Sequence, residues 1–216
     1  MLKRIKNTLL GGNFSYSVTK DKKFFIKFCK GKKEWVSKEF YNLKNNRNKI
    51  DIERLQLVEP ILYSEDKEYI ITKYIDGQDL VELLDPSVYF SFGKMLKLLH
   101  EKGFTHSHME LNDVIFKNGN FTLVDTVFLN EKIPDHDLVT AKISAKLNAL
   151  KQPWNYYKYM SCIKALFEGY KIENYDNYKK EYKRSLENRI RLLMRIGKKN
   201  KIKAYLLKFL YKIGYL

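Results

Sequence analysis

The stretch LLHEKGFTHSHMELNDVIFKNGNFTLVDT in the middle of the chain constrains the fold more than any other. Its apolar runs at residues 114–116 and 121–124 predict two strands. Asn118 and Gly119 between them favour a type I′ hairpin turn, because both central residues of that turn need a positive φ. The hairpin would hold Asp125 beside the preceding loop of His, Glu, Asn and Asp side chains. Such a cluster suits metal and phosphate chemistry.

This layout resembles the catalytic core of the protein-kinase-like superfamily, in which the loop H-x-D-x-x-x-x-N precedes a hairpin and a metal-binding Asp. The corresponding loop here is HSHMELND, and its first residue is His106. The chain departs from the pattern at two positions, with His108 in place of the catalytic Asp and Asp113 in place of the metal-binding Asn. The resemblance implies that Asp113 and Asp125 bind Mg²⁺ and that His108 occupies the position of the catalytic base. Glu110 and His106 are the alternative bases nearby, although the resemblance gives His106 the role of bracing the loop.

The N-terminal region resembles the nucleotide-binding sheet of the same superfamily. Two glycines, Gly11 and Gly12, open an alternating strand, and FFIKF at residues 24–28 predicts the returning strand of a hairpin. The resemblance implies that both glycines lie in a loop over the nucleotide phosphates and that Lys27 binds these phosphates. The alternative is a plain hairpin, in which Lys27 is the outward-facing residue of a half-buried strand.

A helix is predicted over EWVSKEFYNLKN at residues 34–45, because apolar side chains recur there at helical spacing. The resemblance implies that Glu39 in this helix forms an ion pair with Lys27 and so positions the lysine against the phosphates. Glu34 is the competing candidate for this partner. A solvent-exposed Glu39 with no such role is the alternative.

Two antiparallel strands are predicted at residues 57–63 and 69–75, and the second leads into Asp76-Gly77. This segment resembles the hinge of the superfamily, which implies that main-chain groups of Lys73, Tyr74 and Ile75 bind adenine. A short helix is predicted next, over residues 79–84.

Longer helices are predicted at residues 88–100 and 135–147, and Gln152-Pro153-Trp154 ends the second. In the first, apolar residues recur at steps of three and four. These residues are Tyr89, Phe92, Leu96 and Leu99.

The resemblance covers residues 11–147 and predicts an α+β, two-lobed protein-kinase-like fold. Residues 1–76 would form an N-lobe with a small antiparallel sheet and one helix. Residues 77–190 would form a mostly helical C-lobe with the catalytic loop and the metal-site hairpin. Residues 191–216 would form a separate basic helix.

The C-terminal segment is basic and amphipathic. Residues 191–216 contain eight Lys and Arg and no acid, and Ile202, Leu206, Phe209 and Ile213 recur at helical spacing. This composition is typical of a helix in a membrane interface; a helix packed on the domain with solvated lysines is the alternative. The whole chain has 41 Lys and Arg against 25 Asp and Glu, a net charge of +16. That charge predicts a polyanionic partner, unless it reflects only a Lys- and Asn-rich genome.

Other features limit the classes of function. There is no apolar run long enough to span a membrane, and residues 1–10 are interpreted as mature protein. The two cysteines, Cys29 and Cys162, lack metal-ligand spacing and indicate a reducing cytoplasm. Aromatic and basic residues are not interleaved as in a stacking platform, so no nucleic-acid partner is expected. We expect a monomer.

Among kinases of this fold, the chain is most similar to the small bacterial enzymes that phosphorylate heptose of the lipopolysaccharide core. This resemblance implies an ATP- and Mg²⁺-dependent kinase of a lipid-linked or phosphorylated glycan, peripheral on the inner face of the cytoplasmic membrane. Residues 191–216 would contact the anionic membrane surface. Because His108 replaces the catalytic Asp, a nucleotide-binding pseudokinase that acts as a scaffold is the alternative.

Overall fold

The computed structural model describes residues 3–5, 14–195 and 198–212. By its contacts the chain forms two compact units, which we describe separately. Unit 1 comprises Met1–Leu83, Leu98–His106 and Asn112–Glu131, and unit 2 comprises Leu84–Lys97, Ser107–Leu111 and Lys132–Leu216. The boundaries expected from the sequence after residues 76 and 190 stay predictions.

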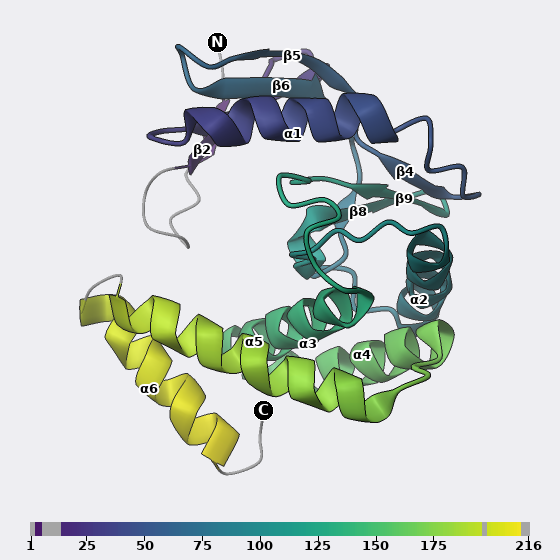
Figure 1. The fold of residues 1–216 in the computed structure, drawn as a ribbon, viewed down its shortest axis with the longest axis vertical. Helices are drawn as coiled ribbons and strands as arrows, with labels where there is room; N and C mark the ends of the chain where they lie inside the picture. Colours follow the sequence, from purple (N-terminus) through teal and green to yellow (C-terminus); the bar gives the residue numbers. More distant parts are fainter. Residues whose placement is uncertain (1–2, 6–13, 196–197, 213–216) are drawn as a thin grey trace. The chain divides into compact units, whose positions relative to one another are not determined.

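Unit 1 begins with a five-stranded antiparallel sheet of order β1-β2-β3-β6-β5 (Figure 1). Its strands are β1 (Lys3–Ile5), β2 (Phe14–Val18), β3 (Phe24–Cys29), β5 (Pro60–Ser64) and β6 (Tyr69–Lys73). The predicted hairpin of β2 and β3 is confirmed, whereas β1 was not expected from the sequence. The predicted glycine turn at Gly11 and Gly12 lies outside the described residues.

Helix α1 (Lys33–Asn46) covers the sheet beside β5 and β6 and confirms the predicted helix (Figure 1). Val36, Glu39 and Leu43 form its buried face, at steps of three and four. The sheet contributes Ile70 and Cys29 to the same core.

Unit 1 also contains a four-stranded sheet of order β4-β9-β8-β7. Its strands are β4 (Leu55–Leu57), β7 (Gln78–Asp79), β8 (Val114–Lys117) and β9 (Asn120–Leu123). The predicted β8–β9 hairpin is confirmed, and Asn118 and Gly119 have φ values of +50° and +80°, as a type I′ turn requires.

Two sequence-based predictions in this region are wrong. The single strand expected over residues 57–63 is divided: Leu57 belongs to β4, which pairs in parallel with β9, and β5 joins the other sheet. The burial of Leu55 and Leu57 against β9 explains the division. The short helix expected over 79–84 is replaced by β7 and a turn, since Leu80 is buried and its N–H donates to the Val114 carbonyl.

Strand β6 ends at Lys73 rather than continuing to Ile75. Gly77 follows, where the chain passes against β8. A Cβ at this position would lie 2.6 Å from the Ile115 side chain and 2.7 Å from the Phe116 carbonyl oxygen. Only glycine allows that approach.

Unit 2 is helical. It consists of most of α2 (Pro86–Glu101), together with α3 (Pro134–Lys151), α4 (Tyr156–Tyr170), α5 (Tyr175–Arg195) and α6 (Lys198–Lys212). Helix α3 packs against both α4 and α5 (Figure 1). The predicted helices at 88–100 and 135–147 are confirmed, and the four periodic apolar residues of α2 are fully buried.

The basic C-terminal segment is divided between two helices. Arg191 lies near the C-terminal end of α5, and Arg195 is the last residue of this helix. Helix α6 packs on α5, and its Ala204 and Leu207 are buried. Of the predicted apolar stripe, Ile213 lies outside the described residues, and Phe209 has 58% of its surface exposed. Among the described helices, none is long and apolar enough to cross a membrane.

Candidate active site

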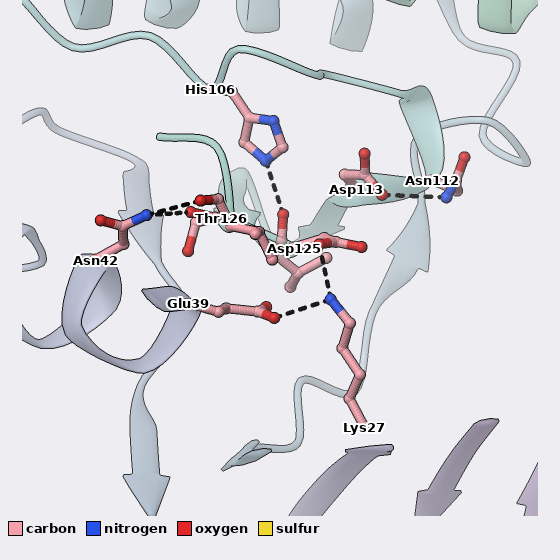
Figure 2. A network of polar contacts seen from close by, with 10 residues as sticks. Lys27, Glu39, Asn42, His106, Asn112, Asp113, Asp125 and Thr126 are labelled. Atoms are coloured by element: carbon pink, nitrogen blue, oxygen red, sulfur yellow. Dashed lines mark hydrogen bonds and ion pairs between the residues drawn. The ribbon is translucent and has the colours of Figure 1, made fainter. Parts of the chain in front are cut away.

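Unit 1 brings Lys27 of β3 into contact with two carboxylates (Figure 2). Its Nζ donates hydrogen bonds to Oε2 of Glu39 at 2.9 Å and to Oδ1 of Asp125 at 2.7 Å. Lys27 and Glu39 are 5% and 3% exposed, whereas the Asp125 side chain is 41% exposed. Burial opposes the charge on the ammonium, but Asp125 and Glu39 outweigh it and raise the pKa of Lys27 well above its ordinary value. The lysine is therefore a fixed cation beside a solvent-accessible carboxylate.

Of the two glutamates considered as partners of Lys27, the structure selects Glu39. It lies on the buried face of α1, three residues after Val36, while Glu34 is exposed. A helix presents residues three and four apart on one side, so burial of Val36 and Leu43 directs Glu39 toward β3.

Asp125 follows β9 in a left-handed conformation, with φ +56°. Such a backbone is unfavourable for an aspartate and persists where surrounding contacts fix it. His106 Nε2 lies 2.8 Å from the carbonyl oxygen of Val124, and the Val124 N–H donates to the Asp113 carbonyl. The predicted bracing residue His106 thus contacts the residue directly before Asp125.

Asn42 of α1 holds the other side of this segment, and sequence reasoning missed it. Its Nδ2 donates to the carbonyl oxygens of Thr126 at 2.8 Å and Val127 at 3.1 Å (Figure 2). Its position three residues after Glu39, on the same side of the helix, was the available clue. One helix therefore supplies both the partner of Lys27 and an anchor for the chain after Asp125.

Asp113 belongs to the short 3₁₀ helix η1 (Leu111–Asp113) and is 7% exposed. Asn112 Nδ2 donates to its Oδ1 at 3.1 Å. Tyr16 of β2 is paired with Lys27 of β3 in the sheet. Burial raises the pKa of the Tyr16 phenol to about 12; the charge of Lys27 lowers it, and the charges of Asp125 and Asp113 raise it. The three charged side chains therefore act on one phenol of unit 1.

The Mg²⁺ that the resemblance implies would need oxygen donors from this site. Within the described part of the chain, no group of three or more His, Cys, Asp and Glu side chains could by itself hold a metal ion. Asp113 and Asp125 supply carboxylate oxygens, however, and Mg²⁺ in nucleotide sites is typically held by one or two carboxylates, phosphates and water. The residues present fit that kind of site.

Two of the three predicted hinge residues donate their main-chain N–H groups to other parts of the protein. The N–H of Lys73 donates to the Glu59 carbonyl, and the N–H of Tyr74 donates to the Lys23 carbonyl. Of the three predicted adenine contacts, the amide of Ile75 is therefore the donor to test. A cavity of about 610 Å³ borders all three residues, but its lining includes neither Lys27 nor Asp125, so we do not assign it to the phosphate end of the site.

His108 belongs to unit 2. Its Nε2 lies 3.6 Å from Oε1 of Glu110, and the same oxygen accepts a hydrogen bond of 2.9 Å from Arg189 of α5. The structure thus brings Lys27 into direct contact with Glu39 and with Asp125 within unit 1. His108 has a different carboxylate, Glu110, as its neighbour.

Comparisons with known proteins identify the fold. The sequence matches no protein-family model and no curated protein. Similar solved structures include an aminoglycoside phosphotransferase with GDP and kanamycin, with a TM-score of 0.64, 9% identity and coverage of 96% of this chain and 92% of that one. Another is an aminoglycoside phosphotransferase with streptomycin and ATP, with a TM-score of 0.61, 11% identity and coverage of 95% and 89%.

A macrolide 2′-phosphotransferase from Brachybacterium faecium is also similar, with a TM-score of 0.60, 10% identity and coverage of 96% and 91%. The likeness extends over nearly the whole length of each chain, at identities that show the fold alone. The protein therefore has the protein-kinase-like α+β fold, with an N-terminal antiparallel sheet and a helical C-terminal part.

Proposed function

We propose that this protein is an ATP-dependent phosphotransferase that transfers the γ-phosphoryl group to an alcohol. The observation that carries the proposal is the buried ammonium of Lys27, which contacts both Glu39 and Asp125. A buried cation between two carboxylates is costly to desolvate, so a functional reason for it is expected. Phosphoryl transfer provides one, since it depends mainly on positioning and charge neutralisation.

Each residue has a role in this proposal. Lys27 binds the nucleotide phosphates, and Glu39 orients it. Asp125 and Asp113 hold Mg²⁺, which when bound neutralises charge on the phosphates. The anionic Asp113, in place of the neutral Asn of the superfamily, strengthens that attraction. Asn42 and His106 fix the backbone around Asp125.

For the acceptor we propose a membrane-linked glycan, with a lipopolysaccharide core heptose as the specific candidate. The sequence resemblance to small heptose kinases supports this choice, and a net charge of +16 favours an anionic substrate. The structural neighbours carry the names of phosphotransferases for aminoglycosides and a macrolide, which also contain hydroxyl groups. They support an alcohol acceptor in general.

We further propose that α6 contacts an anionic membrane surface. Tyr205 and Phe209 lie one turn apart and are 60% and 58% exposed, and Lys201, Lys208 and Lys212 are exposed on the same helix. Ala204 and Leu207 are buried. The two alternatives left by the sequence are therefore compatible, because one face of α6 packs on the protein while aromatic and basic side chains remain outside. Each basic residue near such a surface contributes about 1 kcal/mol.

The experiment that tests the enzyme is Mg²⁺-dependent ATP binding and ATP turnover with wild-type protein and Asp125→Ala. Rough lipopolysaccharide with unphosphorylated core heptose and kanamycin serve as acceptors. We expect turnover on the lipopolysaccharide that Asp125→Ala abolishes. Asp66→Ala, which removes an exposed carboxylate in the turn between β5 and β6, is the matched control and should behave as wild type.

The second candidate function is a nucleotide-binding scaffold, and the replacement of the superfamily's catalytic Asp by His108 favours it. This candidate predicts Mg²⁺-dependent nucleotide binding without transfer to either acceptor or to water. Transfer to kanamycin but not to lipopolysaccharide would support the proposed phosphotransferase activity and contradict the proposed acceptor.

A further inference from the structure

Unit 1 contains a cavity of about 610 Å³ that the candidate active site does not use. It lies where the end of α1, strand β4, the end of β6 and the β8–β9 turn meet, and every described residue that lines it belongs to unit 1. These lining residues do not include Lys27, Glu39 or Asp125. The volume is within the range of small-molecule sites, about 300–1,000 Å³.

The lining of this cavity is basic. Among its described residues, four cations face two carboxylates, an excess of two positive charges. Just outside the lining, Glu53 beside Arg54 and Lys22 beside Asp76 add one charge of each sign and leave the excess unchanged. A phosphate monoester, with a charge of about −1.5 to −2 at pH 7, would balance it. The lining cations are Arg47, Arg54, Lys73 and Lys117, and the carboxylates are Glu59 and Asp76.

The two carboxylates hold these cations only loosely. Oε2 of Glu59 lies 3.7 Å from a guanidinium nitrogen of Arg47 and 3.6 Å from Nζ of Lys73. Nζ of Lys117 lies 3.9 Å from Oδ2 of Asp76. These separations exceed the usual N–H···O distance of about 2.7–3.2 Å. The cations therefore retain donors for an anion, and phosphate oxygens accept such charge-assisted hydrogen bonds from Arg and Lys.

Strands β4 and β9 fix part of the lining. Arg47 Nε donates to a main-chain carbonyl of β4 at 3.4 Å. Arg54 has a left-handed φ of +67°, which is unfavourable for an arginine, and its carbonyl accepts a hydrogen bond of 2.7 Å from the Phe121 N–H of β9. Gln56 Nε2 donates to Oγ1 of Thr122, which is 3% exposed. The polar wall is therefore largely preorganised.

Neutral polar groups complete the lining and indicate the rest of the ligand. Three amide side chains and a hydroxyl border the cavity beside the cations. An amide both donates and accepts hydrogen bonds, which is the combination that a sugar hydroxyl needs. The residues that supply these groups are Gln56, Asn118, Asn120 and Thr122.

We propose that this cavity binds a phosphorylated sugar, with the phosphate on the basic side chains and the hydroxyl groups on the amides. Lys27 pairs with Ile70 across β3 and β6, so these two side chains and that of Thr72 share one face of the sheet. Lys73 follows Thr72 and projects from the other face. The ligand of the cavity is therefore not the phosphoryl acceptor, and the inference goes beyond the proposed function and does not depend on it.

A group of surface ion pairs without a ligand is the competing explanation. The side chains of Arg54, Lys73 and Lys117 are 63%, 61% and 49% exposed, and ion pairs at such positions contribute little to stability. This explanation predicts that anions bind weakly according to their charge. It predicts no preference for a sugar phosphate over inorganic phosphate.

Isothermal titration calorimetry of the full chain with glucose 6-phosphate and mannose 6-phosphate tests the proposal. We expect at least one of them to bind saturably and at least about tenfold more tightly than inorganic phosphate, with no binding of glucose. Arg54→Gln/Lys73→Gln should weaken this binding at least about tenfold. Lys20→Gln/Lys67→Gln, which removes the same charge from exposed positions of unit 1 outside the lining, is the matched control and should bind as wild type.

Two further measurements identify the contacts. Gln56→Ala should weaken binding of the sugar phosphate about threefold and leave that of inorganic phosphate unchanged, because it removes one hydrogen bond to the sugar. In ¹H–¹⁵N NMR spectra, the sugar phosphate should shift the amide signals of residues 73–76 and 118–120 and leave those of Lys20 and Lys67 unchanged. Addition of MgATP should not displace the sugar phosphate.

Several results would overturn the proposal. Saturable binding of neither sugar phosphate would reject it, and equal affinity for inorganic phosphate would reject the sugar. An equal loss in the control double variant would show that overall charge alone attracts the anion, and displacement by MgATP would make the cavity part of the nucleotide site. None of these measurements uses turnover. A protein without phosphotransferase activity could therefore still confirm this site, and an active one could still contradict it.

Discussion

The charged residues of unit 1 and the loop segment Ser107–Leu111 of unit 2 differ in how far they keep the superfamily pattern. Lys27, Glu39 and Asp125 occupy the positions of the pattern, and Lys27 contacts both carboxylates. In the loop segment, by contrast, His108 replaces Asp and contacts Glu110. Charge neutralisation needs fixed charges at fixed distances, whereas a proton can be accepted by more than one kind of side chain. Under the proposed phosphotransferase function, the position that departs from the pattern is therefore the one whose task more than one kind of side chain can perform.

The largest effect is expected from breaking the ion pairs of unit 1. Lys27→Met should lower turnover by about 10²–10³-fold, because it removes a preorganised cation from the phosphates. It should also lower the free energy of unfolding by about 3–5 kcal/mol, since Glu39 would be buried without its partner. Steady-state kinetics and urea unfolding measure the two effects.

The double variant Lys27→Met/Glu39→Gln separates them. We expect it to recover most of the stability, because the uncompensated charge is gone, and none of the activity. Recovered activity would mean that Lys27 acts only as a structural partner of Glu39.

In the loop segment we expect a loss of stability at low pH that depends on Glu110. A folded-state pKa of about 2 for Glu110, against an ordinary 4.5, is worth about 3 kcal/mol at 1.36 kcal/mol per pH unit. Because the pKa is lowered in the folded state, this stability is present above pH 4.5 and is lost as the pH falls toward 2. Unfolding titrations of wild type and Glu110→Gln should therefore converge over this window. Parallel curves would show that Glu110 is not held as described.

A further prediction concerns Asn42 of α1 in unit 1. Asn42→Leu removes the donor to the Thr126 and Val127 carbonyls, so we expect a loss of about 1–3 kcal/mol in stability and a fall in kcat as Asp125 loses its fixed backbone. Asn45→Leu, at an exposed position three residues later, is the control. A loss of stability with kcat unchanged would show that Asn42 does not position Asp125.

The elements of the fold differ in how well the sequence predicted them. The β8–β9 hairpin, α1 and α2 followed from turn chemistry and periodicity, because local rules decide them. The division of residues 57–63 between two sheets did not, since pairing of β4 with β9 depends on residues more than sixty positions away.

The same limit applies to individual side chains. Helical spacing was sufficient to favour Glu39 over Glu34 once burial was known, but the contact of Asn42 with Thr126 depends on tertiary structure. Arg189 shows the limit most clearly. It lies 79 residues from Glu110, in α5, and no local pattern in the sequence connects the two positions.

The smallest expected effect is on membrane binding by α6 of unit 2, compared with an exposed apolar residue of unit 1. Phe209→Ser and Tyr205→Ser should each weaken binding to vesicles containing phosphatidylglycerol by about tenfold, equivalent to about 1.4 kcal/mol, because each exposed ring would be buried in the interface. Vesicle co-sedimentation at low and high salt measures this. Phosphatidylcholine vesicles should bind weakly in every case, since they lack the charge that attracts Lys201, Lys208 and Lys212. Ile61→Ser on β5 in unit 1, which is 40% exposed, is the matched control, and an equal effect there would show that the contact is not specific to α6.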